Sequence, residues 1–190
     1  MYVRQWGLIT HNFSSVSPWV AHFAGRIPVN SVSAKRVLDY ACGSGRHTLY
    51  LAELGYQVLA VDIDSSSMQT IKYCQPDAIE LRCIDLEMAE FAFDPKLEKY
   101  SGIIVTNYLY RPHLDKILDL LDEGGILIYE TFAMGNEAFG KPSNPNFLLR
   151  ENELLEVVLA KKSFHINAFE NGYVEDPKPA MIQRICAVKT

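Results

Sequence analysis

The chain has 190 residues, 48% of them hydrophobic and 22% charged, a composition that excludes disordered and collagen-like classes and predicts one globular domain. Its formal net charge is −5 at pH 7 and neither half is basic, so we expect no general polyanion surface and disfavour nucleic acid as a partner. The four cysteines form no CxxC pair, so we expect reduced thiols and no metal site.

The first residues, MYVRQWGLITHNF, lack the apolar stretch of a secretory signal peptide. No apolar run reaches the roughly 18 residues that cross a bilayer. We therefore expect a cytoplasmic protein without membrane association, and leave monomer and homodimer both open.

The predicted elements begin with a capped amphipathic helix, in which Ser17 and Pro18 precede Trp19, Val20 and Phe23. From residue 36 onward, short apolar runs alternate with segments of helical period. The expected strands are Arg36–Tyr40, Gln57–Ile63, Ile79–Asp85, Gly102–Asn107 and Ile126–Phe132. The expected helices are Arg46–Leu54, Ser65–Cys74 and Arg111–Asp122, the last ended by Gly124 and Gly125. This alternation predicts a parallel α/β sheet with helices on both faces.

The pattern changes after residue 132. Residues 133–150 are rich in Gly, Asn and Pro and follow a strand's carboxyl end directly, which is typical of a lid or binding loop. From Ser163, the runs SFHINAFE and AMIQRICAV are joined by the turn-rich NGYVEDPKP. They predict a β-hairpin that closes the edge of the sheet.

The strongest motif is VLDYACGSG at 37–45, followed by Asp62 at the end of the next strand. Gly43 and Gly45 lie in the first strand-to-helix turn, where a missing Cβ lets a ligand approach the backbone. Asp62 is suited to binding two ribose hydroxyls. These features alone allow a nicotinamide dinucleotide or another adenosine-containing ligand.

Two residues argue against the dinucleotide and a nicotinamide oxidoreductase. Thr48 occupies the position where the dinucleotide fingerprint needs a third small residue. Asp39 would repel a pyrophosphate at the helix N-terminus but attract a cationic ligand.

The ordered set of this motif, Asp62, Asp85 and VTNY at 105–108 resembles the S-adenosylmethionine (SAM) motifs of class I methyltransferases. The segments SPWV at 17–20, LDYACGSGRHT at 38–48, TNYLYRP at 106–112 and the long run from YETF at 129 to LLE at 156 extend the resemblance. They are similar to compact bacterial methyltransferases grouped with tellurite-resistance-type proteins, over about residues 17–188. The resemblance implies a Rossmann-like seven-stranded sheet, six strands parallel and one antiparallel, with helices on both faces. We expect a single domain over 1–190, in which residues 1–30 form an N-terminal extension, at 1–16, and a capping helix, and residues 133–150 form a substrate loop.

The resemblance implies that one group of residues binds SAM, whose product is S-adenosylhomocysteine (SAH). Asp39 would orient the amino group, Asp62 the ribose, Ile63 the adenine face, and Asp85 and Leu86 the adenine edge. Arg46 and His47 begin the first helix of the sheet motif. Their side chains either contact the methionine carboxylate or face solvent, and both alternatives stay open. The full expected set is Asp39, Ala41, Cys42, Gly43, Gly45, Asp62, Ile63, Asp85, Leu86 and Asn107.

A second group is expected to face the methyl acceptor, although plain packing is an open alternative for its aromatic members. Burial of Glu130 beside Arg111 or Arg184 would favour a role for its carboxylate on the acceptor side of the site. Candidate catalytic residues are Asn107, Tyr108, Arg111 and Glu130, candidate substrate contacts are Trp19, Tyr108, Arg111, Asn136 and Phe139, and Tyr110 and Lys141 are further possibilities.

The reaction expected from this resemblance is an in-line methyl transfer from SAM to a small-molecule acceptor in a water-poor pocket. The strand ends Asn107-Tyr108-Leu109 instead of the Asn-Pro-Pro-Tyr quartet of nucleic-acid methyltransferases, which disfavours that class. A SAM-binding protein without catalysis, and a nucleic-acid or protein methyltransferase, remain alternatives. We also expect the helix at 17–25 and the loop at 133–150 to close over bound SAM.

Overall fold

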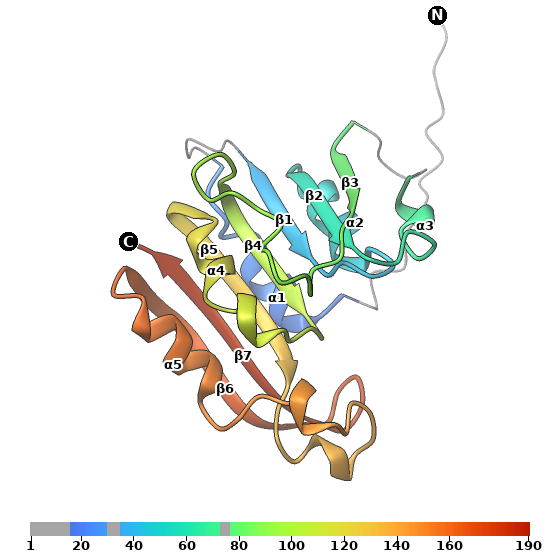
Figure 1. Cartoon of the computed structure of the whole chain (residues 1–190), viewed down its shortest axis with the longest axis vertical. Coiled ribbons are helices and arrows are strands. Elements are labelled where there is room, and N and C mark those ends of the chain that lie inside the picture. Colours follow the sequence, from blue (N-terminus) through green and yellow to red (C-terminus); the bar gives the residue numbers. More distant parts are fainter. Residues whose placement is uncertain (1–15, 30–34, 73–76) are drawn as a thin grey trace, which may run out of the picture.

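The computed structural model describes residues 16–29, 35–72 and 77–190 and arranges them around one seven-stranded sheet (Figure 1). The expected extension at 1–16 lies almost wholly outside the described residues. The strands are β1 Arg36–Tyr40, β2 Gln57–Asp62, β3 Ile79–Cys83, β4 Tyr100–Thr106, β5 Leu121–Phe132, β6 Phe164–Val174 and β7 Ala180–Lys189. The α-helices are α1 Pro18–Ala24, α2 Arg46–Glu53, α3 Gln69–Lys72, α4 Lys116–Asp119 and α5 Glu153–Ala160. Short 3₁₀ turns lie at η2 Arg111–His113, η3 Asn136–Ala138 and η4 Pro145–Phe147.

The strand order is β3-β2-β1-β4-β5-β7-β6. Neighbours from β3 to β5 pair in parallel, whereas β7 is antiparallel to both β5 and β6. Six strands therefore run one way and one runs against them, which confirms the predicted class I methyltransferase sheet. The chain order reverses between β1 and β4, and open α/β sheets bind ligands at the carboxyl ends of strands at such a switch point.

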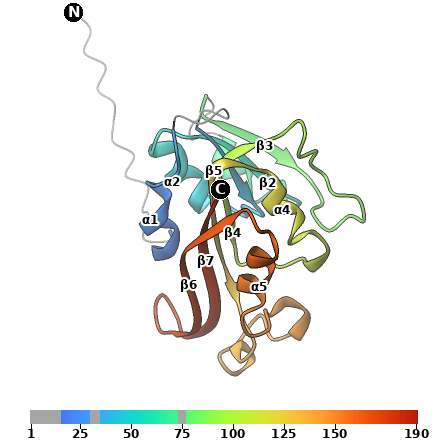
Figure 2. The same ribbon diagram turned by 90° about the vertical axis from the view of Figure 1, so that its left-hand side faces the viewer.

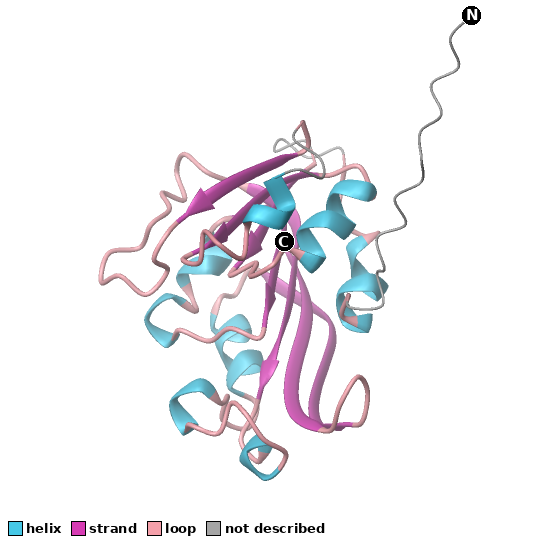
Figure 3. Ribbon diagram, turned by 90° about the vertical axis from the view of Figure 1, so that its right-hand side faces the viewer, coloured by secondary structure: helices cyan, strands magenta, loops and turns pink. Residues whose placement is uncertain are grey.

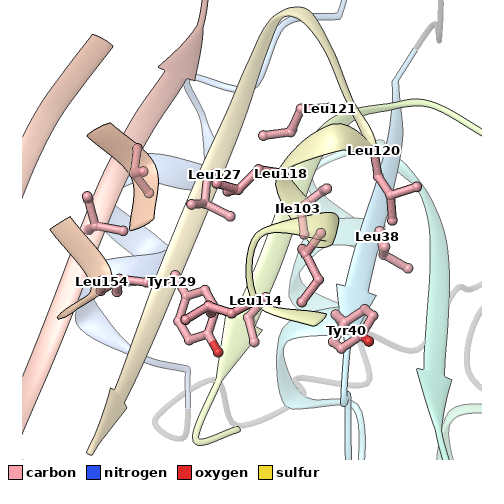
Figure 4. Close-up of a cluster of buried hydrophobic side chains, with 14 of the residues drawn as sticks. Leu38, Tyr40, Ile103, Leu114, Leu118, Leu120, Leu121, Leu127, Tyr129 and Leu154 are labelled. Atoms are coloured by element: carbon pink, nitrogen blue, oxygen red, sulfur yellow. The ribbon is translucent and has the colours of Figure 1, made fainter. Parts of the chain in front are cut away.

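Two hydrophobic layers enclose the sheet because its central strands are buried on both faces. On β4, Ile103 belongs to the layer under α4 and α5, and its neighbour Ile104 to the layer under α1 and α2. Figure 4 shows the first layer, where Leu118 and Leu154 cover Ile103 and Tyr129. Figure 2 shows α1 and α2 on one side of the sheet and α4 and α5 on the other.

The helix α1 forms as the sequence predicts. The Ser17 hydroxyl accepts hydrogen bonds from the backbone N–H groups of Trp19 and Val20, and Pro18 fills the first turn. Its Trp19, Val20 and Phe23 are buried, so α1 is part of the core.

The predicted helix at 111–122 is interrupted and is wrong at its C-terminal end. It is divided into η2 and α4, and β5 already begins at Leu121, which pairs with Tyr100. The next pair joins Gly102 to Ile126, so residues 122–125 bulge out of the ladder. Gly124 has φ +74°, and a Cβ on Gly125 would approach the Asp122 carbonyl to 2.9 Å. The glycine pair serves this bulge and does not end a helix.

The predicted helix at 65–74 is shorter than expected. Asp64 accepts hydrogen bonds from the backbone and hydroxyl groups of Ser66 and Ser67, which holds the chain in a turn until α3 begins at Gln69. Residues 73–76 lie outside the described residues.

The C-terminal hairpin is confirmed, with β6 extending through Val174 so that only residues 175–179 form the turn. The helix α5 was not among the expected elements. Figure 3 shows the hairpin turn and the loop after β5 projecting beyond the sheet at the same end of the molecule. Among the described helices, none combines the length and apolar character needed to cross a membrane.

Candidate functional site

The loop between β1 and α2 carries left-handed backbone at three alternating positions. Ala41 has φ +59°, Gly43 +55° and Gly45 +80°. The loop is tied to the next strand by the Cys42 N–H, which donates to the Val61 carbonyl at 2.9 Å. The two glycines satisfy this geometry without strain, whereas Ala41 adopts it with a Cβ.

The two glycines of this loop have different surroundings. A Cβ on Gly45 would collide with Ile71 Cδ1, so the absence of a Cβ at Gly45 allows α3 to pack against the loop. A Cβ on Gly43 would meet no atom within 4 Å. Gly43 therefore presents its backbone to open space, which is where a ligand could lie against it.

Asp62, at the end of β2, is joined to this loop. One carboxylate oxygen accepts the Gly43 N–H at 2.8 Å, and the other accepts the Asp64 N–H at 2.9 Å. Each oxygen retains a free lone pair for a further donor. The next side chain, Ile63, is 62% exposed, an unusual state for isoleucine that leaves an apolar surface beside the carboxylate.

Asp39 lies beneath the same loop and is 1% exposed. The hydroxyl of Thr48 donates to its carboxylate at 2.5 Å. Burial raises the pKa of Asp39 to about 6, although the Thr48 hydrogen bonds and the charge of Arg46 oppose that rise. A cation bound nearby would favour the ionised carboxylate.

The loop after β3 is fixed from both sides. Asp85 accepts the Glu87 N–H at 2.9 Å, which closes a turn around Leu86. His113 is buried, and its Nδ1 lies 3.1 Å from the Leu86 carbonyl, so this nitrogen carries the proton and donates. Asp85 and Leu86 are thus held at the carboxyl end of β3.

Asn107 follows β4 and has φ +55°, a conformation that asparagine tolerates better than most residues. Its N–H donates to the Glu130 carbonyl at 2.9 Å. It lines a cavity of about 650 Å³ and also a smaller one of about 250 Å³. The end of β4 therefore separates two hollows.

The larger cavity contains an ion pair on its sheet wall. The Glu130 carboxylate accepts from the Ser17 hydroxyl at 2.8 Å and from Arg184 Nη1 at 3.2 Å. Arg184 also donates to Glu170 at 2.6 Å, and its guanidinium carbon lies 4.6 Å from the centre of the Trp19 ring. The lining residues are Val16, Ser17, Pro18, Arg46, Asn107, Glu130, Phe132, Val174, Asp176, Pro177, Lys178, Ala180, Ile182 and Arg184.

His47 anchors α1 to the edge of this cavity. Its Nε2 accepts the Ser17 N–H at 3.1 Å, so Nδ1 carries the proton and faces the Thr106 hydroxyl at 3.3 Å. Burial, assisted by the charge of Arg46, lowers the pKa of His47 to about 3. The imidazole is therefore neutral and structural at ordinary pH.

Arg111 is engaged elsewhere. Its guanidinium donates twice to the buried Glu153 and also to the carbonyls of Asn146 and Leu148. These bonds hold η2, η4 and α5 together. Contact between Arg111 and an acceptor stays a prediction, and the guanidinium has a structural role in any case.

Asn136 and Trp19 also use their polar atoms internally. The Asn136 side chain bonds the Pro142 carbonyl and the Met181 N–H, which closes the loop after β5. The Trp19 indole donates to the Ile185 carbonyl. Neither residue lines the larger cavity.

The aromatic candidates are divided between the two sides of the site. Tyr108 lines the 250 Å³ cavity and packs 5.6 Å from the Tyr40 ring, and its hydroxyl has no hydrogen-bond partner among the described residues. Phe139 is exposed against Tyr173, and Tyr110 packs on His113. Direct contact of any of them with an acceptor stays a prediction.

Sequence reasoning missed several cavity residues, above all Ser17, Phe132 and Lys178. Glu130 and Arg184 were considered as a possible pair, and the structure joins them. The signal for that pair is the strand register, because Glu130 and Glu170 both lie opposite Arg184 in the antiparallel ladders.

The family model described as tellurite resistance protein TehB matches residues 20–167. The chain belongs to the TehB family. No curated protein sequence matches it.

Solved structures share the fold of this TehB-family chain. TehB from Haemophilus influenzae is 23% identical with a TM-score of 0.67, over 85% of this chain and 60% of that protein. The chain thus spans 60% of the length of this relative. A SAM-dependent methyltransferase from Methanosarcina mazei is 16% identical, with a TM-score of 0.63 over 92% and 98% of the two chains. Magnesium protoporphyrin IX methyltransferase from Synechocystis, solved with bound SAH, is 19% identical, with a TM-score of 0.60 over 81% and 73%.

Proposed function

We propose that this TehB-family protein is a SAM-dependent methyltransferase that acts on a small-molecule acceptor. The observation that carries the proposal is the loop at Gly43, which offers an open backbone beside the Asp62 carboxylate at the switch point of the sheet. The family match and the methyltransferase neighbours support the same reading.

The residues present fit SAM. Asp39 would face its amino group, Asp62 its ribose hydroxyls, and the exposed Ile63 one face of its adenine. Asp85 and the Leu86 N–H would bind the adenine edge. When bound, SAM supplies an electrophilic methyl group on a sulfonium centre.

The cavity of about 650 Å³ is the proposed acceptor chamber. It adjoins Asn107 at the end of β4, and its volume lies in the range of small-molecule sites. Glu130 would hold an N–H or O–H group of the acceptor, because its oxygens retain free lone pairs beside Ser17 and Arg184. The apolar lining by Phe132, Val174 and Ile182 would exclude water.

The first test is binding. Thermal shift and calorimetry with SAM, SAH, NADH and NADPH should give stabilisation by SAM and SAH alone, of about 2.7 kcal/mol at a hundred times the dissociation constant. Asp62→Asn should lower SAH affinity at least tenfold, whereas Glu156→Gln, an exposed substitution on α5 with the same loss of charge, should not. Stabilisation by NADH alone would overturn the proposal.

The second test is turnover. Release of SAH is followed with a panel of small acceptors, and tellurite is included because the family carries that name. Turnover should fall when Glu130 is replaced by Gln. Binding of SAM with no turnover on any acceptor would support the alternative, a SAM-binding protein without catalysis.

A further inference from the structure

The proposed acceptor chamber continues outward beyond the carboxyl ends of the strands. A hollow of about 530 Å³, lined by the loop after β5 and by the hairpin turn, shares Phe132 and Lys178 with it. The cavity of about 250 Å³ beside Tyr108 shares Phe132, Pro142 and Phe147 with that hollow. The hollows therefore adjoin one another around Phe132 and lead from Asn107 outward to the surface.

The walls of this path are largely apolar. The chamber is bounded by Val16, Phe132, Val174, Pro177 and Ile182. Farther out, the hollow is bounded by Phe132 again and by Phe147, which is 49% exposed. A bare inorganic ion would gain nothing from such walls, whereas the apolar body of an organic molecule would be removed from water there.

The ion-pair network on the inner wall holds two carboxylates for one guanidinium, and Arg46 lines the same chamber. Glu130 is paired with Arg184, which is paired in turn with Glu170 and covered by the Trp19 ring. A second charged group placed there would have to displace one of these bonds. Because Arg184 is already shared by two carboxylates, the inner end of the chamber is suited to an uncharged hydrogen-bond donor and not to an anionic group.

Two cations lie at the outer end. Lys178, on the hairpin turn, lines both the chamber and the outer hollow, and Lys141, on the loop after β5, lines the outer hollow. Neither ammonium belongs to an ion pair within the part of the chain that the structure describes. Asp176 borders the chamber, whereas the lining of the outer hollow contains no carboxylate. In a chain of net charge −5, this is a local positive site next to an apolar path.

We propose that the acceptor is an organic anion, whose apolar body lies along Phe132 and whose carboxylate or similar group lies between Lys141 and Lys178. The inference rests on the proposed function, since it names the class of molecule that the chamber admits. The uncharged, hydrogen-bonding end of that molecule would point to Asn107 and Glu130.

The test uses a matched pair of ligands, 4-phenylbutyrate and its neutral amide 4-phenylbutyramide, titrated calorimetrically into protein saturated with SAH. The carboxylate should bind about tenfold more tightly than the amide. The double variant Lys141→Met/Lys178→Met keeps most of the apolar stem of both side chains. It should remove this preference while leaving amide binding unchanged.

The control is Lys96→Met/Lys162→Met, which removes two exposed lysines elsewhere with the same change of net charge. It should retain the tenfold preference for the carboxylate. Added salt should weaken carboxylate binding to the parent protein, and it should have little effect on the variant that lacks Lys141 and Lys178. Equal affinity for the two ligands, failure of both to bind, or an equal loss in the two double variants would overturn the inference.

The same preparations distinguish this result from a failure of the proposed function. If SAH does not bind, the proposed methyltransferase activity fails. If SAH binds but 4-phenylbutyrate binds no more tightly than 4-phenylbutyramide, only the assignment of the acceptor as an organic anion fails.

Discussion

The Thr48 hydroxyl donates a hydrogen bond of 2.5 Å to the buried carboxylate of Asp39. Thr48 stands where a dinucleotide-binding protein would carry a small residue, and the structure shows what the hydroxyl does there. It is a partner of the acid beneath the glycine loop. Thr48 and Asp39 therefore form a hydrogen-bonded pair. The negative charge of the Asp39 carboxylate can be neutralised by a proton or by a bound cationic ligand.

Replacement of Asp39 by Asn should raise stability at neutral pH. Because burial raises the folded-state pKa of Asp39 to about 6, above its ordinary value of 3.8, the native protein holds the proton more tightly than the unfolded chain does. The contribution of Asp39 to stability is therefore full below about pH 4 and is lost as pH rises through 6. At about 1.4 kcal/mol for each pH unit, the loss approaches 3 kcal/mol at pH 7.

Urea unfolding at pH 4.5 and pH 7.5 checks this expectation. The gain of Asp39→Asn over the parent should be larger at pH 7.5, and only the difference between the two proteins is used, because His47 acts in the opposite sense. The lowered pKa of His47 makes its own contribution fall as the solution is acidified below about pH 6.5. A gain that does not change with pH would contradict the expectation.

Replacement of Ala41 by Gly should stabilise the protein by roughly 0.5–1 kcal/mol. Ala41 has φ +59°, where a Cβ is costly and glycine is not. The matched control is Ala21→Gly, on an exposed position of α1, which should destabilise by about 1 kcal/mol. Midpoints of urea unfolding measure both, and a loss of stability in Ala41→Gly would show that the Cβ makes a contact worth more than the strain.

The two glycines of the loop should give different phenotypes. Gly43→Ala should lower stability by about 1–2 kcal/mol, because alanine is strained at this positive φ. It should also lower SAH affinity at least tenfold, because its Cβ would occupy the open space beside Asp62 where we propose that the ligand lies. Gly45→Ala should lower stability by more, because its Cβ would also collide with Ile71.

A double mutant separates collision from φ strain at Gly45. Ile71→Ala removes the two carbons that the new Cβ would collide with, so the cost of Gly45→Ala should be at least 1 kcal/mol smaller in the Ile71→Ala background. Equal costs of Gly45→Ala in the two backgrounds, measured by urea unfolding, would rule out the collision.

Replacement of Arg111 by Met should cost about 3 kcal/mol of stability, because it leaves the buried carboxylate of Glu153 with only the exposed Arg150 as its cationic partner among the described residues. The double variant Arg111→Met/Glu153→Met should recover most of that loss. Arg150→Met is the control, since Arg150 is 74% exposed and lies 3.4 Å from the same carboxylate, and it should cost less than 1 kcal/mol. If Arg111→Met instead unfolds normally and abolishes only turnover, Arg111 acts on the acceptor.

The fold was predictable from the sequence where one face or both faces of a strand are buried. The run RVLDY forms β1 and QVLAVD forms β2 because these apolar runs fill the core on both sides of the sheet. The start of β5 was not predictable, because Leu121 is followed by Asp-Glu-Gly-Gly, a polar run that reads as the end of a helix. Only pairing with Tyr100 makes Leu121 part of a strand.

The candidate site was predictable to the extent that it is local in sequence. The loop from Asp39 to Gly45 and the acid Asp62 adjoin through two neighbouring strands, so their meeting follows from the alternation alone. Glu153 as the partner of Arg111, 42 residues away, did not follow, and for Glu130 the sequence left Arg111 and Arg184 as alternatives, of which the structure selects Arg184, 54 residues away. Such pairs depend on strand register and loop path, which no short motif encodes.

The helix α1 precedes all seven described strands in the chain, but its tryptophan packs against the last of them, β7. Its Trp19 donates to the carbonyl of Ile185, 166 residues later in the chain, and lies under Arg184 of the final strand. On the ribosome, α1 emerges long before the strand that covers its tryptophan has been synthesised. A nascent chain therefore holds this apolar face uncovered until β7 has been synthesised, whereas the hydrogen bond of Ser17 to Glu130 needs only β5.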